Sequence, residues 1–184
     1  MKSIKILILL MFLAYTADAQ LPVEQIFKQA YQKGTRDVSG MPGKNYWQNT
    51  ANYDLKIDFN PLTRLVSGTV EVEYINNSPD ALKELWFKLY PNLYKKGVVG
   101  KSRISERDMG DGVTITSFII NNTPKPISSL LIEGTNMHTD ISDFGPGKHL
   151  KLKIAYSYIL NKNSHIRTGE VEMVRTLLPI SFLV

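Results

Sequence analysis

Hydrophobic and polar positions alternate with a period of two through much of the chain after residue 50. In the segment from Tyr53 to Phe59, every second side chain is apolar and those between are Asp54, Lys56 and Asp58. This spacing puts the two kinds of side chain on opposite faces of a strand, one packed and one wet. The segment therefore predicts a half-buried β-strand.

The same period predicts further strands at 66–74, 82–90, 113–120, 126–133 and 150–158. Gly68 interrupts the apolar side of the second strand, which predicts a bulge or a close approach of another backbone. The alternation slips at Glu84 and Leu85, where a bulge fits. We expect a long loop over 94–111 and irregular structure over 134–147.

The N-terminal part has a different period. Leu21 to Gly34 carries apolar residues at the spacing of one helix face, and Gly34 is suited to end a helix. A polar linker over 37–44 follows. One short helix before a series of strands predicts an all-β fold, an antiparallel β-sandwich with a short N-terminal helix.

The first residues have the features of a secretory signal peptide. Two lysines precede an apolar run, Ile6 to Ala14, that is too short for the roughly 20 residues of a membrane span, and Ala17 and Ala19 form a small-x-small cleavage site. We expect cleavage after Ala19 and a mature chain exported to the periplasm or the outside. The alternative interpretation is an uncleaved membrane anchor.

Composition narrows the candidate chemistry. The chain has no cysteine, which excludes thiol catalysis and cysteine-bound zinc, and its net charge of +5 is spread among acids without a basic block. A nucleic-acid partner is therefore not expected. None of the histidines, His138, His149 and His165, lies in a His-Glu-x-x-His motif, so we expect no metal and no cofactor in this chain.

Carboxylates and aromatic residues give weaker signals. Glu71 and Glu73 share one strand face and resemble a glycosidase pair, although a solvated strand face explains them more simply. The aspartates at 108, 111, 140 and 143 lack the order of a calcium loop. An aromatic set is compatible with a sugar-binding platform, but we expect packing to explain it: Tyr46, Trp47, Trp86, Phe87 and Tyr90.

Four motifs in order carry a resemblance to a known family. They are Tyr-Asp-x-x-x-Asp at Tyr53–Asp58, the glycine at Gly68, the Asn-x-Ser-Pro-Asp turn at Asn76–Asp80 and Leu-Tyr-Pro-Asn at Leu89–Asn92. With the Gly-Pro-Gly turn at 145–147 and Arg-Thr-Gly at 167–169, the series resembles the first domain of secreted zinc aminopeptidases of the aminopeptidase N (gluzincin) family. The resemblance spans roughly Tyr46 to Gly169 and implies a saddle-like β domain.

The family's zinc motif and its Gly-x-Met-Glu-Asn loop do not occur in this sequence, so no catalytic or ligand residue carries over. The resemblance ends near Glu172, and residues 173–184 lack alternation; we interpret them as a frameshifted or non-native tail, against the simpler explanation of a native strand or fragment boundary. The expected organisation is a signal peptide at 1–19, a helix and linker at 20–45, an incomplete β domain at 46–172 and this tail.

The resemblance implies a function that belongs to the parent enzyme. We expect this chain to be the truncated, non-catalytic first domain of an exported enzyme that removes N-terminal residues from peptides, with zinc and peptide bound only by the parent. Its partner would be the missing catalytic domain. The alternative, from another class, is a free-standing secreted β-sandwich module that binds carbohydrate or protein.

Overall fold

The computed structural model describes residues 23–98, 104–163, 168–172 and 175–177. The chain divides into two compact units, one up to Trp47 and one from Gln48 onward. Their relative placement is not determined, so each unit is described by itself. The cleavage-site residues Ala17 and Ala19, His165, and most of the tail lie outside the described residues.

The first unit contains helix α2, which is shorter than predicted. It spans Gln25–Lys33 and ends at Gly34, whose φ of 69° is left-handed as the C-cap prediction requires. The apolar face of this helix is largely exposed, and Ile26 is 67% exposed. The guanidinium of Arg36 lies 5.1 Å from the ring centre of Phe27, which partly covers that ring.

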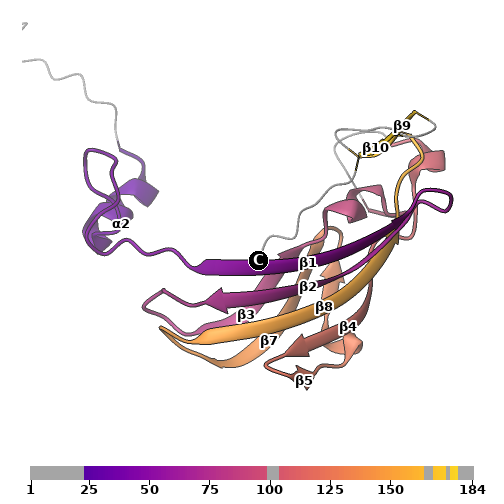
Figure 1. Cartoon of the computed structure of the whole chain (residues 1–184). Helices are drawn as coiled ribbons and strands as arrows, with labels where there is room; N and C mark the ends of the chain where they lie inside the picture. Colours follow the sequence, from indigo (N-terminus) through magenta and orange to yellow (C-terminus); the bar gives the residue numbers. More distant parts are fainter. Residues whose placement is uncertain (1–22, 99–103, 164–167, 173–174, 178–184) are drawn as a thin grey trace, which may run out of the picture. The chain divides into compact units, whose positions relative to one another are not determined.

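The second unit is an all-β fold built from two antiparallel sheets that face each other (Figure 1), which confirms the predicted sandwich-like class. The larger sheet has the order β1-β2-β8-β4-β5 and the smaller has the order β3-β7-β6. The strands are β1 Thr50–Asn60, β2 Leu65–Ile75, β3 Leu82–Lys88, β4 Thr114–Ile120, β5 Thr123–Pro124, β6 Leu131–Glu133, β7 Asn136–Phe144 and β8 His149–Ile159.

A hairpin, β9 Gly169–Glu172 with β10 Arg175–Leu177, follows the two sheets. Short 3-10 turns lie at Tyr90–Tyr94, Glu106–Asp108 and Ile127–Ser129. No helix in the described part of the chain is long and apolar enough to cross a membrane.

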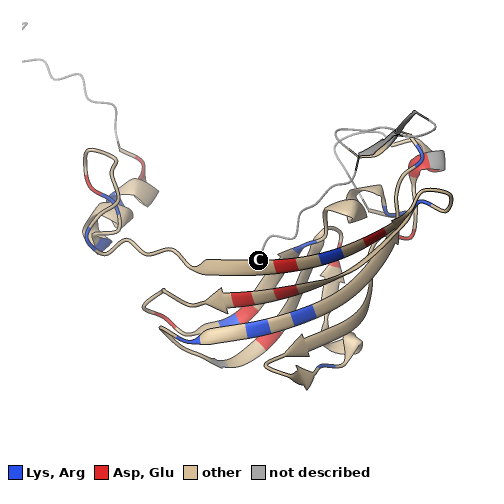
Figure 2. Cartoon of the chain, viewed as in Figure 1, with Lys and Arg blue, Asp and Glu red and all other residues tan. Residues whose placement is uncertain are grey.

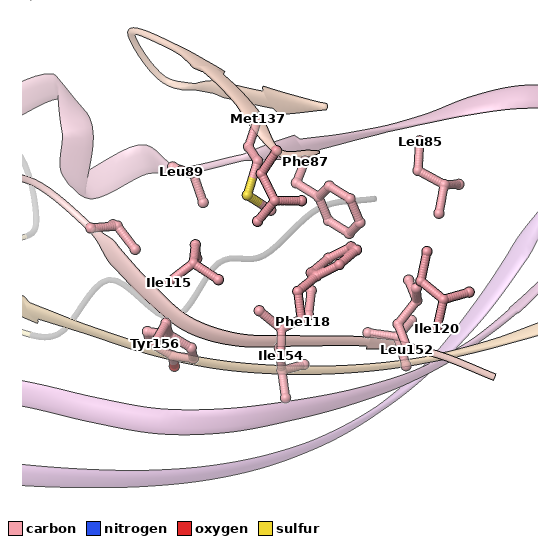
Figure 3. Close-up of a cluster of buried hydrophobic side chains, with 14 of the residues drawn as sticks. Leu85, Phe87, Leu89, Ile115, Phe118, Ile120, Met137, Leu152, Ile154 and Tyr156 are labelled. Atoms are coloured by element: carbon pink, nitrogen blue, oxygen red, sulfur yellow. The ribbon is translucent and has the colours of Figure 1, made fainter. Parts of the chain in front are cut away.

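Alternating side chains from the two sheets fill the space between them (Figure 3). Phe87 of the smaller sheet meets Phe118 of the larger edge-on, at 88° and 5.9 Å between ring centres, a favourable geometry for two aromatic rings. The labelled core residues are Leu85, Phe87, Leu89 and Met137 from the side of β3 and β7, and Ile115, Phe118, Ile120, Leu152, Ile154 and Tyr156 from β4 and β8.

The sequence predicted either a bulge or a close approach of another backbone at Gly68, and the structure confirms the close approach. The register of β2 with β1 and with β8 runs without a shift past this residue, so there is no bulge. Instead, a Cβ added at Gly68 would lie 2.6 Å from the carbonyl oxygen of Lys56 and 3.1 Å from the hydroxyl of Tyr156. The glycine is needed because the neighbouring strand and a tyrosine ring approach it closely.

Two strand predictions were wrong in part. Residues 134–147 were expected to be irregular, yet β7 occupies Asn136–Phe144 and is the central strand of the smaller sheet. Most of its side chains are polar, and of those that the structure describes only Met137, Thr139 and Phe144 are buried, so no apolar alternation is apparent. The strand expected over 126–133 is a 3-10 turn followed by the short β6. The bulge predicted near Glu84 is confirmed by a register shift between Leu82 and Glu84.

Candidate functional site

Three groups of polar or aromatic side chains stand out in the fold: the charged outer face of the larger sheet, the polar residues buried at the turns, and the aromatic residues on the outer face of the smaller sheet. Among the described residues, no group of three or more His, Asp or Glu side chains is arranged to hold a metal ion.

The Glu71 and Glu73 carboxylates are each paired with a cation on β8 and not with each other. The Nζ of Lys153 lies 2.7 Å from Glu71 Oε1, and His149 Nδ1 lies 3.2 Å from Glu73 Oε1. Hydrogen bonds from these partners lower the pKa of both glutamates. A general acid needs a raised pKa, so this pair has the features of a solvated strand face, as the sequence indicated.

The charged residues form a cross-strand pattern on that face (Figure 2). The acids of β2 lie beside the lysines of β8, and the acids of β1 lie on the other side of β2. The register places Asp54 opposite Glu71, and Glu71 opposite Lys153. This cross-strand row therefore contains two acids, Asp54 and Glu71, and one base, Lys153. Lys153 forms its ion pair with Glu71.

The aspartates named in the sequence lie in separate places. Asp108 is buried, and its carboxylate accepts hydrogen bonds from the backbone N–H and the side-chain amide of Asn163 at 2.8 to 3.1 Å. Asp111 is exposed and lies 4.0 Å from Lys96. Asp140 is exposed on β7 opposite Glu84, and the side chain of Asp143 lies outside the described residues. The structure does not bring these carboxylates together.

Buried polar side chains join the turns of the sandwich. Asn76, which is fully buried, donates from its side chain to the carbonyls of Asp80 and Phe144, each at 2.9 Å. Its side-chain oxygen accepts from the backbone N–H and the hydroxyl of Ser78. One amide thus ties the β2–β3 turn to the end of β7.

Asn92 likewise joins separate segments through its side-chain amide, at the opposite end of β3. Its side chain donates to the carbonyl of Gly134 at 2.9 Å and accepts from the N–H of Val113 at 2.7 Å. Thr168 donates to the side-chain oxygen of Asn161 at 3.0 Å. All of these buried polar side chains form hydrogen bonds with neighbouring turns and strands of the fold.

The aromatic set does not behave as the sequence suggested. Phe87 is in the core, but Trp86 points outward from β3 and is 48% exposed. Its indole stacks on the imidazole of His138, with ring centres 4.2 Å apart and planes 7° from parallel. The packing explanation is therefore wrong for Trp86, and likewise Tyr46, Trp47 and Tyr90 remain exposed.

The stack lies among polar neighbours on the outer face of the smaller sheet. His138 Nδ1 is 3.8 Å from Glu84 Oε2, too far for a hydrogen bond, and this buried nitrogen has no hydrogen-bond partner in the described part of the chain. Lys88 bonds the side chain of Asn136 in the next row. A flat aromatic surface held in one orientation and bordered by charged and amide groups is the best candidate binding site.

The sequence predicts the orientation of one of the two stacked residues, Trp86, but not that of His138. Leu85, Phe87 and Leu89 point inward, so the period of two already places Trp86 outward. His138 was not predictable because β7 was not recognised.

Comparisons with family models, with curated proteins and with solved structures gave no match to this chain.

Proposed function

We propose that residues 46–172 serve as the non-catalytic first β domain of an exported zinc aminopeptidase. In that enzyme the domain walls the active-site cleft and supports the catalytic domain, which binds the zinc and the peptide whose N-terminal residue is removed. The reaction itself belongs to that partner domain.

One observation supports this proposal most directly. Asn76, Ser78, Asn92 and Thr168, which belong to the motifs that carry the resemblance, are buried and hold turns together. Buried side chains that make hydrogen bonds between turns specify an architecture, whereas catalytic side chains are presented to a substrate. The motifs therefore fit a domain that supports catalysis without performing it.

The decisive experiment begins with the DNA downstream of the Val184 codon, read in all three frames. We expect a His-Glu-x-x-His motif in a shifted frame. The purified chain alone should leave leucine 4-nitroanilide intact, whereas the chain continued in that frame should hydrolyse it and lose this activity on chelation of zinc. Downstream DNA without such a motif would refute the proposal.

A second function is favoured by the exposed indole: a carbohydrate-binding module. The C–H groups of a sugar ring are attracted to the negative face of an aromatic ring, and polar groups beside the ring bind the hydroxyls. Trp86 supplies the ring, and Glu84 and Lys88 flank it on the outward side of β3.

The two functions predict different results for one variant. If Trp86 binds sugar, the purified chain should sediment with insoluble cellulose, chitin or peptidoglycan, and Trp86→Ala should abolish this. Trp47→Ala, which removes an exposed tryptophan from the other unit, is the matched control. No retention on any of the three polysaccharides would eliminate this second function.

A further inference from the structure

The long edge strand of the larger sheet has an open side. β1 spans Thr50–Asn60, eleven residues, and in the described part of the chain it pairs only with β2. An edge of this length presents a row of backbone donors and acceptors that can pair with another strand. The opposite edge of the same sheet is short, because β5 has two residues.

The inner face of β1 is incompletely covered. Leu55 is 36% exposed, although its cross-strand neighbour Val70 is fully buried. Ile57 and Phe59 are half-buried and pack against the core. The apolar side chains at this edge of the sandwich are therefore only partly covered. A strand added to β1 would extend the apolar inner face beside them.

The outer face of β1 carries an incomplete charge pattern. The β2 residue opposite Asp54 is another acid, Glu71, and like charges directly opposite are unfavourable. Glu71 is engaged with Lys153, and no cation lies within ion-pair distance of Asp54 in the described part of the chain. A strand added on the open side with a base opposite Asp54 would complete the row.

We propose that two copies of this chain associate edge to edge through β1, antiparallel, with the two-fold axis at Leu55. In this register Leu55 meets Leu55, and Asp54 of each copy lies opposite Lys56 of the other. The same symmetry places Ile57 opposite Tyr53 and Phe59 opposite Ala51 on the inner face. Because Leu55 is the middle residue of β1, the whole strand is paired, with roughly ten backbone hydrogen bonds.

Other registers are less favourable. An axis at Lys56 would place Lys56 against Lys56 and Asp54 against Asp58, which are repulsive pairs. An axis at Ile57 brings Lys56 opposite Asp58 but pairs only residues 54–60. Shifts of an odd number of residues bring the polar face of one strand beside the apolar face of the other.

Charge variants test this register. The purified full chain should sediment as a reversible dimer. Asp54→Lys and Lys56→Asp should each raise the dimer Kd by at least about tenfold, because attractive pairs become repulsive ones. An equimolar mixture of the two variants should form a heterodimer, and the double variant D54K/K56D should dimerise like the natural chain because it keeps opposite charges opposed. At a concentration where both proteins are monomeric, Asp54→Lys should not lower the melting temperature, because it removes the Asp54–Glu71 repulsion within one copy.

A cross-link reports the axis directly. The chain contains no cysteine, so Leu55→Cys gives one thiol per copy, and mild oxidation should join two copies by a disulfide across the axis. Ile57→Cys is the control and should remain uncross-linked. A monomer at every concentration tested, a dimer indifferent to Asp54→Lys, or cross-linking by Ile57→Cys and not by Leu55→Cys would overturn the proposal.

Discussion

Asn76 shows how one side chain at the residue scale holds distant parts of this fold. Its amide bonds a carbonyl 68 positions later, at Phe144, and also closes its own turn through Ser78 and Asp80. The side chain is fully buried, so each lost bond leaves a polar group that water does not reach. The sequence identified the turn, but its hydrogen bonds to β7 depended on a strand that was not predicted.

Replacing Asn76 by alanine should therefore be costly. We expect Asn76→Ala to lower the free energy of unfolding by about 2–4 kcal/mol, because it leaves the carbonyls of Asp80 and Phe144 without their donor. Urea unfolding followed by tryptophan fluorescence measures this. Asp80→Ala, which removes an exposed side chain from the same turn, is the control. Equal losses for both variants would contradict a role for the buried amide.

The charged pair on β2 and β8 predicts a dependence of stability on pH. Folding lowers the pKa of Glu71 below its usual 4.5, first through the hydrogen bond from Lys153. A lowered carboxyl pKa contributes stability above the unfolded-state pKa, and this is lost as pH falls through the folded-state pKa. Glu71→Gln should therefore be slightly less stable than the natural chain at pH 7, and this difference should disappear as pH falls below 4.5 and through the lowered folded-state pKa of Glu71. A constant difference from pH 7 to pH 3 would contradict this.

At the scale of the element, strand β2 depends on the absence of a side chain at Gly68. Gly68 lies on the inward side of the strand, opposite Ile57 on β1 and Tyr156 on β8. The space that a side chain would occupy is taken by the Lys56 carbonyl and the Tyr156 hydroxyl. The strand is continuous because this residue has no Cβ.

A side chain at Gly68 should disturb the centre of the larger sheet. Gly68→Ala should destabilise the chain by about 1–3 kcal/mol, since the contact of 2.6 Å is with backbone that does not swing aside. Gly68→Val should cost more. Thermal unfolding followed by circular dichroism gives both values, with Ser67→Ala on the outer face as the control. A neutral Gly68→Ala would show that β1 moves away without cost.

Elements with a strong alternation were predictable, and those without it were not. β1, β2, β4 and β8 carry apolar residues at every second position, or nearly so, and their places were confirmed. β7 was missed because its middle residues are His138, Thr139 and Asp140, which read as a loop. Since the candidate site needs Trp86 from one strand and His138 from the other, its geometry could not follow from the sequence.

At the scale of the whole molecule, the long strands β1 and β8 occupy different positions in the larger sheet. β8 lies between β2 and β4 and is paired on both sides, whereas β1 is paired only with β2 in the described part of the chain. Association should consequently depend on β1 and not on β8.

Tyrosine ionisation offers a test of the whole sandwich. Burial, with a smaller effect of neighbouring Tyr156, raises the pKa of Tyr158 to about 12. A raised tyrosine pKa contributes stability below the unfolded-state value of about 10 and loses it as pH rises toward the folded-state value. We expect an alkaline titration of absorbance at 295 nm to show delayed ionisation that disappears in denaturant. Tyr158→Phe should remove part of this delay, and an unchanged titration would contradict the burial of this phenol.

The pairing of β2 with β8 also has a consequence for the order of events during synthesis. β2 leaves the ribosome with β1, but its second neighbour is made only when the chain has grown to residues 149–159. Sheets closed by such distant partners fold slowly, because a long loop must be closed before the contacts form. The larger sheet thus remains incomplete until residues 149–159 have been synthesised, and the β1–β2 hairpin lacks its neighbour β8 until then.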